Sequence, residues 1–203
     1  MGGVGAVLAE EIARAHQAGR TAGTVVLVEG VSDRRAIEAL AARRRRDLPA
    51  EGVMVIPTAG VTNLGRFLEL LGPDGYDVRL AGLVDEGEVR QLALALPRIG
   101  LGGPLDQGAL EAHGFFVCVR DLEDELIRAL GTVRMVELIE SQGHLRRFHS
   151  FQNQPAQRHK TIEQQLWRWL GNHKIRYAPL MVETLDLDRV PAPLDGVLTF
   201  TAD

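Results

Sequence analysis

The stretch TVVLVEGVSD, residues 24–33, decides the fold. Residues 24–28 form a continuous run of β-branched and apolar side chains, which predicts a strand buried on both faces. Residues 29–31 predict a tight turn, and Ser32 is a favourable N-cap for a helix that extends to the basic run 43–46. A strand buried on both faces and followed directly by a helix is typical of a parallel sheet covered by helices.

The same alternation of strand and helix repeats along the chain. Strand-like runs occupy residues 53–56, 78–84 and 115–119, and helical patterns occupy residues 64–71 and 122–130. Such alternation predicts an α/β fold with a mostly parallel four-stranded sheet and right-handed crossovers. Helical patterns precede and follow this region, at residues 4–18, 133–141, 162–170 and 175–185. We therefore expect an N-terminal helix at 1–21, a catalytic core at 22–130 and a helical C-terminal extension at 131–203.

Composition and charge narrow the class of protein. The 203 residues carry a formal net charge of −4, so any contact with nucleic acid must be local. The single cysteine, Cys118, lies in an apolar run, which predicts a buried, inert thiol and excludes a disulfide within the chain. No long apolar span or cleavable leader appears, and this favours a cytoplasmic protein without a membrane segment.

Acidic residues follow three of the four predicted strands. Glu29 follows the first strand, Asp85 the third, and Asp121 and Glu123 the fourth, while Asp33 lies four residues after Glu29. All strands of a parallel sheet end at one edge, so these carboxylates are expected to converge. Their mutual repulsion would be relieved by a hard divalent cation. The pattern predicts a site for one or two Mg²⁺ or Mn²⁺ ions.

A purely structural explanation covers part of this pattern. Asp33, Asp121 and Glu123 lie at predicted helix starts, where an acidic residue is favourable because of the helix dipole. The dipole does not explain Glu29 or Asp85, which directly follow apolar strands. Taken together, the five acids favour the functional interpretation. The six histidines lack zinc-type spacing, so a zinc enzyme is not expected.

The segment VEGVSD, residues 28–33, resembles the opening motif of Toprim domains, most closely those of the OLD (overcoming lysogenization defect) nucleases. The resemblance covers residues 22–130 and implies a Toprim, Rossmann-like fold. It matches the family's metal-binding acids to Glu29 and Asp33, to Asp85, and to the Asp121/Glu123 pair. The chain departs from the family at Gly87, where Toprim domains typically carry a second aspartate. Glu88 is the candidate that would replace it as a ligand.

The resemblance also implies a lysine downstream of the third acidic motif, which would stabilise charge at the cleaved phosphate. Two lysines qualify, Lys160 and Lys174, and they are the only lysines in the chain. Lys174 fits the family arrangement better because it opens the last amphipathic segment. A lysine that simply faces solvent remains the alternative for both.

These features predict a divalent-metal-dependent nuclease, a DNA endonuclease or nicking enzyme, with Glu29 and Lys174 or Lys160 in catalysis. One alternative is a subunit that binds DNA or an ATPase with weak or no catalysis, and another is a primase-like nucleotidyl transferase. Many OLD proteins join the Toprim domain to an ABC-type ATPase, but this chain has no G-x-x-x-x-G-K-[ST] loop. A stand-alone Toprim protein is therefore expected, with DNA and a separate ATPase as candidate partners. The oligomeric state is left open.

Several basic and aromatic segments are ambiguous. The run Arg43 to Arg46 predicts either a contact with a nucleic-acid backbone or, preferably, a solvated helix end. The Gln- and Asn-rich stretch from Phe148 to His159 predicts an exposed connection. Trp169 has core spacing, whereas Trp167 could pack or could stack on unpaired bases. A second basic cluster is a better candidate for nucleic acid and comprises His144, Arg146, Arg147, His149, Arg158, His159 and Lys160.

Overall fold

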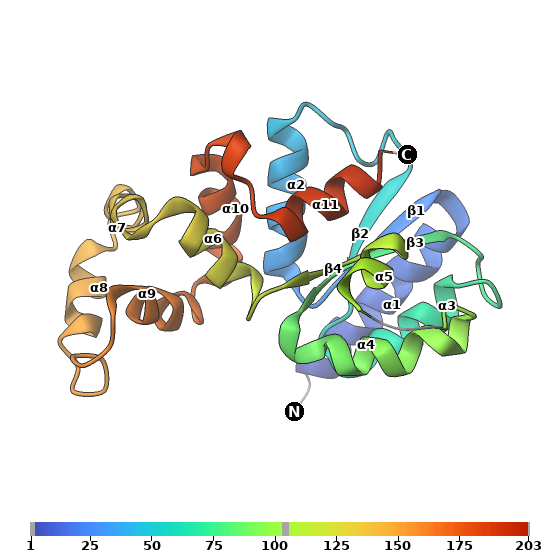
Figure 1. Ribbon diagram of the computed structural model, residues 1–203, viewed down its shortest axis with the longest axis horizontal. Helices are drawn as coiled ribbons and strands as arrows, with labels where there is room; N and C mark the ends of the chain where they lie inside the picture. The colour runs from blue at the N-terminus through green and yellow to red at the C-terminus, as the bar shows by residue number, and fades with distance from the viewer. Residues whose placement is uncertain (1–2, 103–105, 203) are drawn as a thin grey trace.

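A parallel four-stranded sheet forms the centre of the protein. The computed structural model describes residues 3–102 and 106–202 (Figure 1). The strand order is β2-β1-β3-β4, and each neighbouring pair is parallel. The strands are β1 (Thr24–Val28), β2 (Val53–Pro57), β3 (Arg79–Asp85) and β4 (Phe115–Cys118). The predicted α/β class and its four parallel strands are confirmed.

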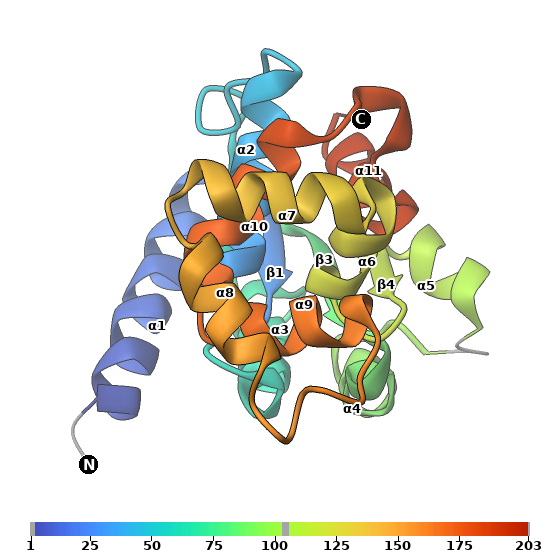
Figure 2. The same ribbon diagram turned by 90° about the vertical axis from the view of Figure 1, so that its left-hand side faces the viewer.

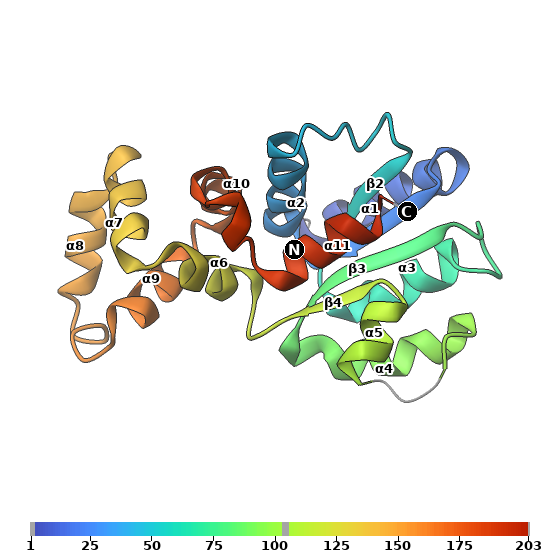
Figure 3. The same ribbon diagram turned by 45° about the horizontal axis from the view of Figure 1, so that its top comes forward.

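Helices cover both faces of the sheet because successive residues of each strand point to opposite sides. In β1, Val25 and Leu27 belong to one buried cluster, and Val26 and Val28 belong to the other. Figure 3 shows α2 and α11 above the sheet and α3, α4 and α5 below it. The cluster of Val25 and Leu27 packs against α1 (Gly3–Thr21), α3 (Leu64–Leu71), α4 (Val89–Ala95) and α5 (Gln107–Ala112). The cluster of Val26 and Val28 packs against α2 (Val31–Arg43), α6 (Leu122–Leu130), α10 (Lys174–Thr184) and α11 (Ala192–Phe200).

A group of three helices lies beyond the carboxyl ends of the strands, and α6 and α10 connect it to the sheet (Figures 1 and 2). These helices are α7 (Thr132–Ser141), α8 (Leu145–Gln152) and α9 (Ile162–Leu170). Phe148, Leu166 and Trp169 belong to the same buried cluster as Val26 and Val28 of β1. The helical C-terminal part therefore shares its core with the sheet, and the division at residue 130 stays a prediction. Short 3-10 turns complete the fold at Val61–Asn63, Glu86–Glu88, Leu96–Ile99 and Leu187–Arg189.

Two local expectations are wrong. The Gln- and Asn-rich stretch is not entirely an exposed connection, because α8 extends to Gln152 and Phe148 is fully buried within it. Ser32 is not the N-cap of α2, because the helix begins at Val31 and Gly30 occupies the cap position. The side chain of Asp33 takes the capping role instead, by accepting a hydrogen bond from the Gly30 N–H.

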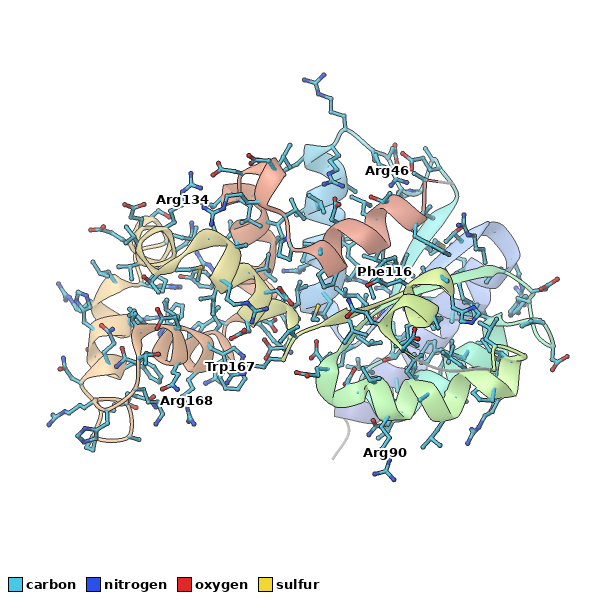
Figure 4. The ribbon with its side chains drawn as sticks, in the orientation of Figure 1. Arg46, Arg90, Phe116, Arg134, Trp167 and Arg168 are labelled. Carbon is cyan, nitrogen blue, oxygen red and sulfur yellow. The ribbon has the colours of Figure 1, made fainter. Side chains whose placement is uncertain are left out.

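The basic run at the end of α2 is more than a solvated helix end, because three of its arginines contact other helices of the protein. The Arg43 guanidinium donates to the carbonyl oxygens of Val182 and Leu185 at the end of α10. Arg44 pairs with Asp195 of α11, and Arg46 donates to the carbonyl oxygen of Leu198. Figure 4 shows Arg46 beside α11. Three of the four arginines thus attach the end of the chain to α2, a role that the sequence did not indicate.

Other expectations are confirmed by burial. Cys118 is 0% exposed, and burial raises the pKa of its thiol strongly, so the thiol is inert at neutral pH. Trp169 is buried, as its helical spacing predicted. Within residues 3–102 and 106–202, no helix combines the length and apolar character that a membrane crossing requires.

Candidate metal centre

The register of the sheet brings the acidic motifs to one edge. Val28 at the end of β1 lies opposite Leu83 of β3, and Asp85 at the end of β3 lies opposite Cys118 of β4. Glu29 follows β1 directly, and Asp121 follows β4 after two residues. All three carboxylates are therefore at the carboxyl edge, where open α/β sheets bind their ligands.

Asp33 lies in the first turn of α2 and points into this edge. It is 8% exposed, and its Oδ2 accepts a hydrogen bond of 2.9 Å from the Gly30 N–H. Burial raises the pKa of Asp33 to about 6, although the Gly30 hydrogen bond and the charge of Lys174 oppose the shift. The negative charge of Glu29 adds to the rise, so these two carboxylates of the first motif act on each other.

Asp85 and Glu88 supply the second acidic motif. Burial, together with the charges of Asp33, Glu29, Glu88 and Asp121, raises the pKa of Asp85 to about 8. Burial, and after it the charge of Glu29, raises the pKa of Glu88 to about 7. Glu88 therefore faces the same cluster as the acids of the first motif. That Glu88 replaces the aspartate missing at Gly87 stays a prediction.

Asp121 and Glu123 form the third motif at the start of α6. Asp121 is the N-cap, and its Oδ1 accepts a hydrogen bond of 2.8 Å from the Asp124 N–H. Glu123 is 5% exposed, and its Oε1 is buried without a hydrogen-bond partner. The pKa of Glu123 is raised to about 7. Burial and the charge of Asp33 raise it, and the charge of Lys174 opposes the shift. An unpartnered buried carboxylate oxygen is costly and is suited to a cation.

Trp167 of α9 reaches this third motif from the helical group. Its indole Nε1–H donates to Asp121 Oδ2 over 2.6 Å, and Figure 4 shows the side chain toward the end of β4. The Arg120 guanidinium lies over the indole ring, 3.5 Å from its centroid. Arg120 has a left-handed backbone with φ 69°, and its N–H donates to Glu86 Oε2. The loop before Asp121 is therefore held by both the second motif and α9.

Only one of the two candidate lysines joins the acids. Lys174 is the first residue of α10. Burial by itself would lower the pKa of its ammonium group. The charges of Glu123, Asp33, Glu29 and Asp85 outweigh burial, so the pKa of Lys174 is raised and its ammonium stays charged. Lys160 lies just before α9 and is not among the main charges that act on the pKa of any of these carboxyls.

A cavity of about 350 Å³ opens on the third motif and on Lys174. Its volume falls in the range of small-ligand sites. The sheet edge and the helical group both contribute to its wall, so the site lies between them. The lining residues are Asp121, Glu123, Phe151, Gln157, Trp167, Arg168, Gly171 and Lys174.

The chemistry of the donor set fits a hard divalent cation. All candidate ligands are carboxylates, which Mg²⁺ and Mn²⁺ prefer, and a cation would relieve the repulsion that raises their pKa values. Within the described ranges, however, no three His, Cys, Asp or Glu side chains already surround a common point closely enough to hold an ion. Ligation therefore requires the carboxylates to move toward one another. Asp121 in particular has both oxygens in hydrogen bonds.

Sequence reasoning does not predict two contacts of this site. The spacing of Trp167 allows packing or base stacking but does not indicate a bond to Asp121, and no pattern marks Arg120. The Trp167–Asp121 hydrogen bond joins residues 46 positions apart, so no local pattern could indicate it. The backbone at position 120 is left-handed, but the residue there is arginine and not the glycine or asparagine that would indicate such a turn.

Comparison with known proteins agrees with the fold. Residues 21–86 match the family model for the Toprim domain of overcoming lysogenization defect protein-like proteins. The structure is similar to the C-terminal region of the Xanthomonas campestris pv. campestris OLD protein, with a TM-score of 0.70 and 26% identity over 89% of this chain and 94% of that one. No curated protein sequence matches the chain.

A second solved structure supports the fold alone. The C-terminal region of the Burkholderia pseudomallei OLD protein has a TM-score of 0.67 and 22% identity, over 90% of this chain and 98% of that one. The matched sequence segment contains Glu29, Asp33 and Asp85, and the structural similarity extends across the helical group. Residues 21–86 are therefore similar to the Toprim domain of OLD-like proteins, and the chain shares its fold over most of its length with the C-terminal regions of OLD proteins.

Proposed function

We propose that the chain is a divalent-metal-dependent nuclease that hydrolyses phosphodiester bonds in DNA. One observation carries the proposal: the acids that follow β1, β3 and β4 act on one another's pKa values at one sheet edge, together with Lys174. This combination of oxygen ligands and one half-buried cation is suited to phosphate chemistry. The match of residues 21–86 to the OLD-like Toprim family model supports a function on nucleic acids.

The roles of the residues follow from their positions. Glu29, Asp33, Asp85, Glu88, Asp121 and Glu123 would hold one or two Mg²⁺ or Mn²⁺ ions. When bound, such ions lower the pKa of water and stabilise the charge on phosphoryl oxygens. Glu29 would orient the attacking water and accept its proton. Lys174, which stays protonated, would place its positive charge where the phosphodiester gains negative charge.

A second candidate function is a DNA- or ATPase-binding subunit with weak catalysis. Two observations favour it: Gly87 lacks the carboxylate of the second motif, and the described acids do not yet surround a common point. A separate ABC-type ATPase as the partner of such a subunit stays a prediction.

Cleavage of supercoiled plasmid in Mg²⁺ or Mn²⁺ separates the two functions. The wild-type chain is expected to nick or linearise the plasmid, and Glu29→Gln is expected to reduce the rate at least about 100-fold because it removes a ligand and the proton acceptor. Glu140→Gln, an exposed change on α7, is the matched control and should cleave at the wild-type rate. Equal cleavage by Glu29→Gln and wild type would defeat the site assignment. Metal-independent DNA binding without cleavage would favour the binding subunit.

A further inference from the structure

A second and larger cavity lies beside the acidic cluster, at the start of α10. Its volume is about 620 Å³, and it shares Gly171 and Lys174 with the cavity of the third motif. The two hollows therefore adjoin at the lysine that faces the carboxylates. The wall consists of Arg35 of α2, Gln142 after α7, residues 171–176, Pro179 and Leu180.

Two of the positive charges that line this cavity have no ion-pair partner among the described residues. Arg35, Lys174 and Arg176 line it, and no acidic residue does. Among the ion pairs of residues 3–102 and 106–202, none involves Arg35 or Arg176, and both side chains are exposed. The neighbouring Arg34, in contrast, pairs with Glu38. In a chain of net charge −4, two unpaired arginines in one hollow indicate a site for an anion.

Each of the two guanidinium groups is held by one hydrogen bond and keeps further N–H donors available. Arg35 Nη1 donates to the Ile175 carbonyl oxygen over 3.2 Å, and Arg176 Nη2 donates to Gln142 Oε1 over 2.9 Å. A guanidinium has five N–H donors, so most of them stay free for a ligand. Its planar fork matches two oxygens of a phosphate group.

The rest of the wall indicates more than a free phosphate. Ile175 is 48% exposed, and with Pro179 and Leu180 it provides an apolar surface next to the arginines. A nucleotide presents this combination of an anionic phosphate and a less polar sugar and base. The volume is also within the usual range of sites that enclose a small ligand.

We propose that this cavity binds the nucleotide next to the cleaved phosphodiester, with Arg35 and Arg176 on its phosphate. The inference rests on the proposed nuclease function and deepens it, because it assigns the direction in which the strand leaves the acidic cluster. The scissile phosphate lies at Lys174, and the strand continues from there over the start of α10 toward α2. No contact with the paired arginines 43, 44 and 46 is involved.

The test is DNA binding by a double variant, measured as fluorescence anisotropy of a labelled single-stranded oligonucleotide with Ca²⁺ in place of Mg²⁺. Arg35→Gln/Arg176→Gln removes two positive charges from the cavity. Arg20→Gln/Arg45→Gln is the matched control, because it removes the same charge from two exposed, unpaired arginines that precede β1 and β2, at the opposite edge of the sheet. Thermal unfolding of both double variants checks that each is folded.

The cavity variant is expected to raise the Kd roughly tenfold and to make the dependence of log K on log salt shallower by about 0.7, because the contact with one phosphate is lost. The control should keep the wild-type Kd and salt slope apart from a small general effect of charge. Equal Kd values and slopes for the two double variants would overturn the proposal.

Plasmid cleavage by the same proteins distinguishes this failure from failure of the nuclease function. If wild type cleaves and the cavity variant binds and cleaves like the control, the subsite is wrong and the nuclease stands. If no protein cleaves but binding still depends on Arg35 and Arg176, the subsite stands and the nuclease is wrong.

Discussion

Trp167 connects α9 to the acidic cluster. Its indole N–H binds Asp121, and its ring carries the guanidinium of Arg120. Groups that hold a metal ligand in place typically change metal affinity by 10-fold to 100-fold when they are removed. Trp167 therefore acts on the site by positioning Asp121.

We predict that Trp167→Phe weakens Mn²⁺ binding by roughly 10-fold, because phenylalanine keeps an aromatic face for Arg120 and loses only the N–H donor. Isothermal titration with Mn²⁺ measures the affinity. Trp169→Phe is the control, because Trp169 is buried and stacks on His173 at 4.1 Å between ring centroids. That change should lower the melting temperature and leave the Mn²⁺ affinity as it is. An unchanged affinity in Trp167→Phe would contradict the positioning role.

Gly87 allows a direct test of the incomplete second motif. A Cβ atom added at this position would meet no atom within 4 Å, and Gly87 has no left-handed backbone that would strain a side chain. Gly87→Asp is therefore expected to fold and to bind Mg²⁺ or Mn²⁺ about 10-fold more tightly, because it adds a carboxylate ligand. Glu88→Gln is expected to weaken binding. If neither change alters the titration, this turn does not contribute to the metal site.

At the scale of elements, α2 anchors the C-terminal helices. The Arg43 guanidinium donates to the Val182 and Leu185 carbonyl oxygens at the end of α10, where the last carbonyl groups of a helix have no N–H partner one turn further on. Because α10 begins with Lys174, this contact also holds the lysine's helix against α2. The anchor couples the stability of the end of the chain to the geometry of the site.

Arg43→Gln is expected to lower the free energy of unfolding by about 2 kcal/mol, since hydrogen bonds to charged donors contribute about 1.5–3 kcal/mol. Urea denaturation measures the loss. The neighbouring Arg45→Gln should change stability by less than about 0.5 kcal/mol, because Arg45 is exposed and unpaired in the described part of the chain. A similar small effect of both variants would show that the contact at the end of α10 is not stabilising.

At the scale of the whole molecule, the acidic cluster makes stability depend on pH. Asp33, Asp85, Glu88 and Glu123 have folded-state pKa values of about 6, 8, 7 and 7, all above the ordinary values for these groups. Between the ordinary and the raised values, the folded protein holds protons that the unfolded chain has released. The metal-free protein should therefore lose stability as pH rises through this window.

Between about pH 5 and pH 8 we expect the metal-free protein to lose on the order of 3 kcal/mol, after discounting for partial exposure and mutual coupling. Thermal unfolding in EDTA across this range measures the trend. Addition of Mn²⁺ at the higher pH should recover the loss, since it binds the deprotonated cluster of the folded state. The variant Asp85→Asn/Glu123→Gln should flatten the profile. Stability that rises with pH in EDTA would show that these carboxyls are not buried together.

The sequence by itself determined the parallel sheet, the resemblance to OLD-like Toprim domains and the positions of the acids at the strand ends. These features are local, because apolar runs define strands, helical periodicity defines helices, and parallel strands must end at one edge. The ligand roles of the six acids stay predictions. The chain alone could not indicate whether α8 is ordered, since its Gln- and Asn-rich end resembles a loop while Phe148 is buried by distant residues.

Only the tertiary structure decided which lysine faces the acids, that Trp167 binds Asp121 and that the basic run attaches α10 and α11. Lys174 follows Asp33 by 141 positions, and Arg43 and Val182 are 139 positions apart. The folded core brings such residues together, because the helical group must bury Phe148, Leu166 and Trp169 against the same cluster as β1. Contacts of this range depend on how whole elements pack, and no local pattern encodes them.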